Sequence, residues 1–202
     1  MNMFLAAADP LSTSVSLASL WLPIVVGAVA CFFASSLIWM ALPIHKGDYK
    51  SLGAAESRLG EVIRSLGSGP GVAGQYVFPH INHATFSKDQ DAQARHKAGP
   101  WGFIVVNAGP ANMGKSLGMW IVNLLLVGLL IGYVASHALG RGASFGEVMQ
   151  VTMTVAILAH GGNILTDSIW KGRPWSLLPG AIFDAVVYAA LTSAAFALLW
   201  PK

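Results

Sequence analysis

Charged residues and cysteines are scarce in this sequence of 202 residues. Lys, Arg, Asp and Glu make up 10% of the chain, whereas a soluble domain contains about a quarter. Because 54% of the residues are hydrophobic, the composition is typical of a membrane protein. Cys31 is the only cysteine, which excludes an intrachain disulfide and a site with several thiolate ligands from one chain.

Positive charge is absent from the start of the chain, since residues 1–18 contain no Lys or Arg. A cleaved signal peptide has a basic flank, so we expect the first apolar run to remain in the mature protein. Apolar runs long enough to cross a bilayer as helices lie at 20–44, 116–137, 146–169 and 177–200. These runs predict an all-α membrane protein with four transmembrane helices.

The basic residues are distributed unevenly between the two sides of these spans. Ten of the twelve Lys and Arg residues lie in 45–115 or between the third and fourth spans, and only Arg141 and Lys202 lie elsewhere. By the positive-inside rule, residues 45–115 form a cytoplasmic segment, and both termini, including an outer tail at 1–19, lie on the other side. For a bacterial inner membrane, that side is the periplasm.

The sequence GPANMGKS matches the phosphate-loop pattern at Gly109, Gly114, Lys115 and Ser116. However, no charged residue follows from Leu117 to Ser136, so the helix after the motif is expected to be a membrane span. Residues 45–115 are also too few for the parallel sheet of a phosphate-loop enzyme. We therefore interpret the motif as a chance match and expect no bound nucleotide.

The cytoplasmic segment shows local patterns of a small α+β unit. Apolar residues at helical spacing predict an amphipathic helix from Leu52 to Leu66. Short strands are expected at 75–78 and 101–106, and Ser87 with Gln90 fits a capping box for a second helix that ends near Lys97.

Three histidines of this segment, His80, His83 and His96, are candidate metal ligands. Imidazole suits zinc, copper or iron. Solvated or hydrogen-bonded histidines explain the same residues, because His80 follows a proline in chain expected to be extended.

Polar residues within the predicted spans form a second candidate site. Ionisable groups in a membrane are costly and face other helices or water. Six polar residues are expected at similar depth in the inner half: Asn123, His160, Asn163, Asp167, Asp184 and Tyr188. They suggest either a proton, ion or metal site, in which His160 changes charge near neutral pH, or a set of hydrogen bonds between helices.

Small residues recur every four positions in the second span, at Gly128, Gly132 and Ser136. Such a stripe permits close helix approach. Similar stripes lie in the first and fourth spans. Three stripes can serve a four-helix bundle alone, but a spare one would favour a homo-oligomer, which we expect.

Four stretches carry a resemblance to a known family: WMALPIHKGDYKSL, QYVFPH, GPANMGK and IWKGRPW. In them, the chain resembles a family of bacterial integral membrane proteins with no assigned activity. The resemblance implies a bacterial inner membrane and the same four-span layout, and it supplies no catalytic residues.

Taken together, these patterns predict a non-enzymatic structural or accessory component of a membrane assembly. Its expected partners are the lipid bilayer and a second copy or a larger membrane complex, without nucleic acid or a cofactor. One alternative is a small transporter or channel that uses the intramembrane polar residues. Another is a membrane-bound metalloenzyme that uses the three histidines.

Overall fold

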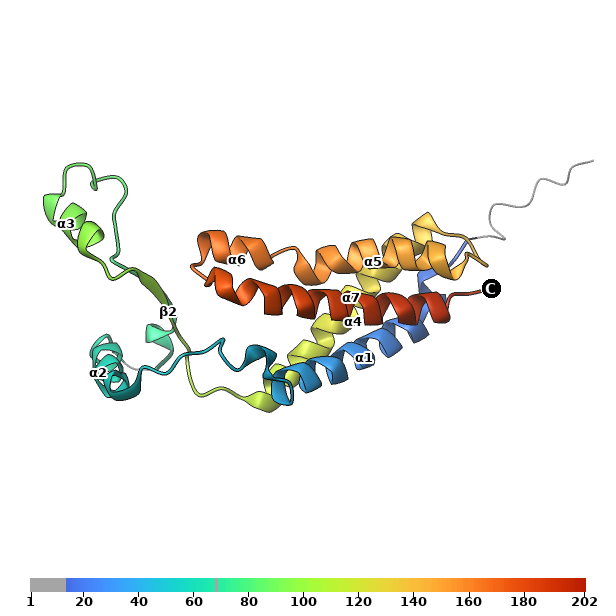
Figure 1. The fold of residues 1–202 in the computed structure, drawn as a ribbon, viewed down its shortest axis with the longest axis horizontal. Helices are drawn as coiled ribbons and strands as arrows, with labels where there is room; N and C mark the ends of the chain where they lie inside the picture. The colour runs from blue at the N-terminus through green and yellow to red at the C-terminus, as the bar shows by residue number, and fades with distance from the viewer. Residues whose placement is uncertain (1–13, 68) are drawn as a thin grey trace, which may run out of the picture.

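The computed structural model describes residues 14–67 and 69–202, so most of the predicted outer tail, residues 1–13, lies outside the described residues. Four helical segments form an elongated bundle (Figure 1). Each is long and apolar enough to cross a membrane, which confirms the prediction of four such helices. The segments are Leu17–Met40, Met113–Ala138, Phe145–Trp170 and Trp175–Leu198.

Within these segments, the α-helices are α1 (Trp21–Met40), α4 (Met113–Ala138), α5 (Phe145–Gly161), α6 (Ile164–Trp170) and α7 (Leu178–Leu198). Helix α7 packs against both α1 and α5, and α4 closes the bundle by packing against the same two helices. Small residues allow the close approach: a Cβ added at Gly27 of α1 would lie 3.4 Å from the Cα of Thr192 in α7.

The bundle has a core at each of its two ends. At the end where the chain terminates, Leu20, Ile131, Val148 and Phe196 are fully buried. At the opposite end, a smaller core contains Cys31, Leu124, Tyr188 and their neighbours. The outward faces carry large exposed apolar side chains, as expected of helices surrounded by lipid.

The first helix is shorter than the predicted span at 20–44, because α1 ends at Met40. Pro43 disfavours the helical conformation for the residue before it, and Leu42 is extended with φ −85° and ψ 150°. A short 3-10 turn at Pro43–His45 follows. It carries His45 back beneath the end of α1.

The third span is divided, whereas the sequence predicted one continuous helix over 146–169. Helix α5 ends at Gly161, and α6 begins at Ile164. Two successive glycines, Gly161 and Gly162, lie at the break, and glycine is among the weakest helix formers.

A small cap lies between α1 and α4 in the sequence and beyond one end of the bundle in space (Figure 1). It contains α2 (Glu56–Ser65), β1 (Gly74–Phe78), α3 (Gln90–Ala98) and β2 (Gly102–Val106), in the predicted order of helix, strand, helix and strand. The strands pair antiparallel, with Val77 opposite Phe103. Asp89, and not Ser87, caps α3 by accepting a hydrogen bond from the Ala92 amide.

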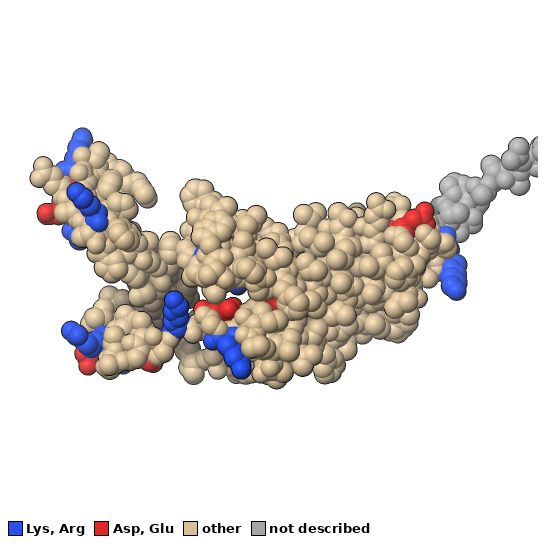
Figure 2. Space-filling view, viewed as in Figure 1, with Lys and Arg blue, Asp and Glu red and all other residues tan. Residues whose placement is uncertain are grey.

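Charged side chains gather at the two ends of the molecule (Figure 2). Lys and Arg are prominent on the cap, and another group lies at the far end of the bundle, while the visible face between them is almost free of charge. An uncharged surface on long apolar helices is what contact with a bilayer requires.

The phosphate-loop-like segment leads directly into the second apolar helix. The Asn112 side chain caps α4 by accepting a hydrogen bond from the Lys115 amide at 3.0 Å. The preceding strand β2 pairs only with β1, antiparallel, within the described residues. The motif therefore marks the start of a 26-residue apolar helix.

Candidate functional site

Four side chains form a hydrogen-bonded group at the end of the bundle nearest the cap. Asp184 of α7 accepts a hydrogen bond from Trp39 Nε1 at 3.1 Å, and its other oxygen lies 3.2 Å from His45 Nε2. The second ring nitrogen of His45 lies 2.9 Å from Asp48 Oδ2. We call this group the Asp184 cluster: Trp39, His45, Asp48 and Asp184.

The geometry around His45 favours its protonated form. A carboxylate only accepts hydrogen bonds, so a ring whose two nitrogens both face carboxylates donates from both, as imidazolium does. Burial lowers the pKa of His45. The hydrogen bonds and charges of Asp48 and Asp184 together raise it by more than burial lowers it, so the pKa lies above its ordinary value. The Trp39 ring stacks on the imidazole, with centroids 3.9 Å apart and planes 2° from parallel.

A cavity of about 580 Å³ lies beside this cluster, between α1, α4 and α7. We call it the Asp184 cavity. Asp184, which is 8% exposed, reaches its wall together with three aromatic side chains, Trp39, Trp120 and Tyr188. Trp120 Nε1 donates to Ser35 Oγ at 3.0 Å, and its ring meets Tyr188 edge-on at 6.0 Å between centroids. The cavity thus has aromatic walls and one buried carboxylate.

Two more of the six polar residues predicted from the sequence lie near Asp184. Tyr188 lines the same cavity. Its ring also meets that of His160 edge-on, with centroids 5.7 Å apart. His160 Nε2 is buried, and it has no hydrogen-bond partner within the described residues.

The other three polar residues neither line the Asp184 cavity nor hydrogen-bond to Asp184. Asn163 precedes α6 and donates to Asp167 Oδ1 at 3.0 Å, and the same oxygen pairs with Lys171 Nζ at 2.7 Å. Asn123 is exposed on α4. The break between α5 and α6 interrupts the helical spacing on which the predicted alignment of His160 with Asn163 and Asp167 depended.

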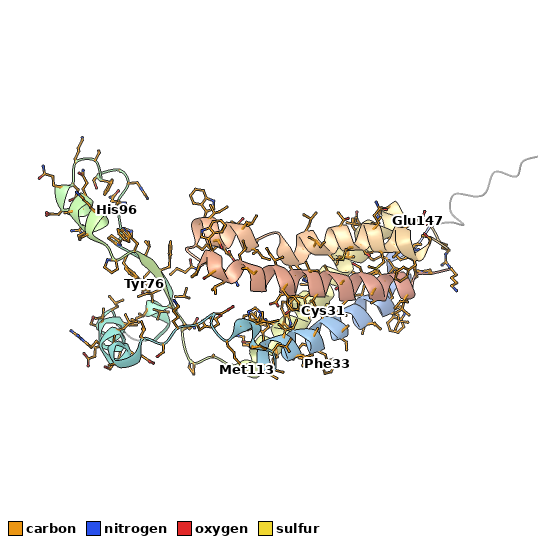
Figure 3. All side chains as sticks on the ribbon, viewed as in Figure 1. Cys31, Phe33, Tyr76, His96, Met113 and Glu147 are labelled. Atoms are coloured by element: carbon orange, nitrogen blue, oxygen red, sulfur yellow. The ribbon has the colours of Figure 1, made fainter. Side chains whose placement is uncertain are left out.

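The three histidines of the cap line one cavity of about 440 Å³, together with aromatic residues that include Trp101 and Phe103. Within the described residues, no three side chains of His, Cys, Asp or Glu are grouped closely enough to hold a metal ion. His96, labelled in Figure 3, stacks edge-on against Phe86, with centroids 5.5 Å apart.

The predicted small-residue stripe of α4 is used for packing inside the bundle. A Cβ added at Gly128 would lie 3.2 Å from Ile24 of α1, and one at Gly132 would lie 3.3 Å from Phe196 of α7. Ser136 donates to the Tyr133 carbonyl of its own helix.

Trp39 and His45, which contact Asp184, and Asp48, which contacts His45, were not among the site residues predicted from the sequence. Trp39 lies near the end of the first predicted span, where an interfacial aromatic residue is common, and His45 lies just beyond that span. The available signal was His45 and Asp48 three residues apart, directly after a proline that ends the first helix. This pattern places an imidazole and a carboxylate together at the bundle end where Asp184 was already expected.

The chain was compared with protein-family models, curated proteins and solved structures. No protein-family model, no curated protein and no solved structure matches the chain.

Proposed function

We propose that this chain is an integral protein of a bacterial inner membrane and acts as a non-enzymatic accessory component of a membrane assembly. In this proposal, the bundle is the anchor, and the cap is the part that meets a partner protein. The basic residues at the cap end support a cytoplasmic cap with both termini in the periplasm.

The observation that carries the proposal is the exposed apolar face of the two-stranded sheet. Phe103 and Val105 alternate along β2, and Trp101 directly precedes the strand. All three are at least half exposed, and Val77 lies opposite Phe103 on the same face. A two-stranded sheet is marginally stable alone. Unpaired edges and exposed apolar faces are surfaces on which proteins associate.

Size measurements on the purified protein in mild detergent test this proposal. The wild type is expected to elute with a partner protein, whether another chain or a second copy. Val105→Lys is expected to elute as the chain alone, because it places a charge on the apolar face beside Phe103. Ala94→Lys adds the same charge on an exposed position of α3 and should elute like the wild type. A wild type that elutes as a single chain would contradict the proposal.

The orientation has its own test, because Cys31 is fully buried and leaves little background for thiol labelling. In intact cells, a membrane-impermeant maleimide should label Arg141→Cys but not Arg58→Cys. Labelling of Arg58→Cys alone would reverse the proposed topology.

The contact between His160 and Tyr188 keeps a transporter as a second candidate, because it connects a buried imidazole to the cavity that Asp184 lines. Purified protein in liposomes would then conduct protons or metal ions. Both His160→Ala and Asp184→Asn should abolish that flux, and a flux that neither variant changes would exclude these residues as the pathway.

A further inference from the structure

The Asp184 cavity has a chemistry that the proposed accessory role does not use. Its wall holds a buried carboxylate next to three aromatic side chains. Its volume, about 580 Å³, lies within the usual range of small-molecule sites.

Asp184 has acceptor capacity left for a ligand. Its two oxygens each accept one hydrogen bond, from Trp39 and from His45. An ionised carboxylate offers about four acceptor positions. One further donor can therefore bind without displacing either partner.

The charge of the Asp184 cluster favours a positively charged donor. Asp48 and Asp184 contribute two negative charges, and protonated His45 contributes one positive charge, so the cluster keeps one net negative charge. Aromatic faces also attract cations, most strongly when water is excluded. Trp120 and Tyr188 supply such rings beside the carboxylate, whereas Trp39 already stacks on the His45 imidazole.

The position of the cavity indicates an amphiphile and not a fully water-soluble cation. Met40, the last residue of α1, and Met113, the first residue of α4, line the cavity and are largely exposed. Met113 lies at the cap end of the bundle in Figure 3, at the level where a span meets lipid headgroups. The amides that begin α4 at Met113 are at a helix start, which attracts phosphate, although the Lys115 amide is already bonded to Asn112.

We propose that the Asp184 cavity binds the headgroup of an ethanolamine phospholipid, with the primary ammonium on Asp184 and the acyl chains leaving past Met40 and Met113. Phosphatidylglycerol, which is anionic and lacks the ammonium, is disfavoured by the net negative charge. The proposal requires only that the bundle lies in a bilayer, and it does not depend on the cap having a partner.

Native mass spectrometry of the delipidated full-length protein in detergent tests this site. Phosphatidylethanolamine and phosphatidylglycerol with identical acyl chains are the probes. The wild type is expected to retain one phosphatidylethanolamine about tenfold more tightly, since a hydrogen bond to a charged group supplies roughly that factor. Equal retention of the two lipids would overturn the proposal.

Three variants locate the effect. Asp184→Asn removes the charge and should lose the preference, whereas Asp167→Asn removes a carboxylate on α6 and should keep it. Ser36→Phe fills the cavity from a half-buried position on α1 and should also lose it, with the Asp184 cluster intact. If Asp184→Asn fails to fold, Ser36→Phe decides alone: a preference that survives the filled cavity refutes the site.

Competition with free ethanolamine tests whether the ligand is a lipid or a soluble amine. At millimolar concentration it should not displace the bound phosphatidylethanolamine, because it lacks the chains that contact the apolar rim. Complete displacement by free ethanolamine would mean that the site recognises a soluble amine, which contradicts the proposed lipid.

Discussion

The two ends of the bundle are held together by different physical means. At the end away from the cap, fully buried apolar side chains such as Leu20, Ile131 and Phe196 interlock, and Trp200 donates to the Gly140 carbonyl at 2.9 Å. At the cap end, two carboxylates share one imidazole beside an open cavity. Apolar packing leaves no group that responds to pH, whereas buried charges are costly and respond to it. One end is therefore held by apolar packing, and the other by hydrogen bonds among buried titratable side chains.

The largest expected effect is at the apolar end. Phe196→Ala should lower the free energy of unfolding by about 3–5 kcal/mol, because the fully buried ring leaves a cavity. Unfolding of the detergent-solubilised protein measures this loss, which should not change with pH. Phe183→Ala, at an exposed position of α7, is the matched control and should cost much less. Equal losses would mean that the two positions do not differ in packing as described.

Breaking the Asp184 cluster should have the next largest effect. His45→Ala removes the imidazole from both carboxylates and leaves Asp184 buried with one hydrogen bond, at a cost of about 2–4 kcal/mol. His137→Ala, at an exposed position near the other end of α4, should cost less than 1 kcal/mol or so. The same unfolding measurement compares them, and a His45→Ala variant as stable as wild type would show that the cluster adds nothing.

The stability of the cap end should fall as pH rises. His45 has a pKa above its ordinary value of 6.5. Its contribution is therefore fully present below about pH 6.5 and is lost as pH rises through the raised pKa. Unfolding measured across this range should show the slope for the wild type and for His137→Gln, but not for His45→Gln. A slope of the opposite sign would contradict the protonated imidazole.

The smallest effect is expected for the ion pair on α6. Lys171→Ala should change the free energy of unfolding by about 1 kcal/mol or less, because both members are partly exposed to solvent. Such a small change would separate the Asp167 pair from the buried Asp184 cluster. A loss as large as that of His45→Ala would instead show that the Asp167 ion pair contributes as much to stability as the Asp184 cluster.

The positions of the helices and strands were the easiest features to predict, because they follow from the local pattern of apolar residues. The four apolar runs and the strand positions at β1 and β2 could be read from hydropathy and alternation alone. The small residues of α4 were also evident, although their partners Ile24 and Phe196 were not.

The Asp184 cluster could be predicted only in part, for a physical reason. Asp184 and Tyr188 lie on one face of α7, so their shared depth follows from helical spacing. His45 reaches them because Pro43 ends α1 early and turns the chain back, and such a turn depends on local backbone geometry and not on hydropathy. Asn163 and Asp167 were misplaced because the break after Gly161 shifts the phase of everything beyond it.

The contact between the cap and the bundle has a mechanical consequence. The Phe103 ring of β2 lies over Gly172, which has φ 68° and where an added Cβ would lie 3.1 Å from the ring. Gly172 belongs to the short connection that leads into α7, the helix that carries Asp184. Any movement of the sheet that keeps this contact must therefore also move Gly172 and the connection that leads into α7.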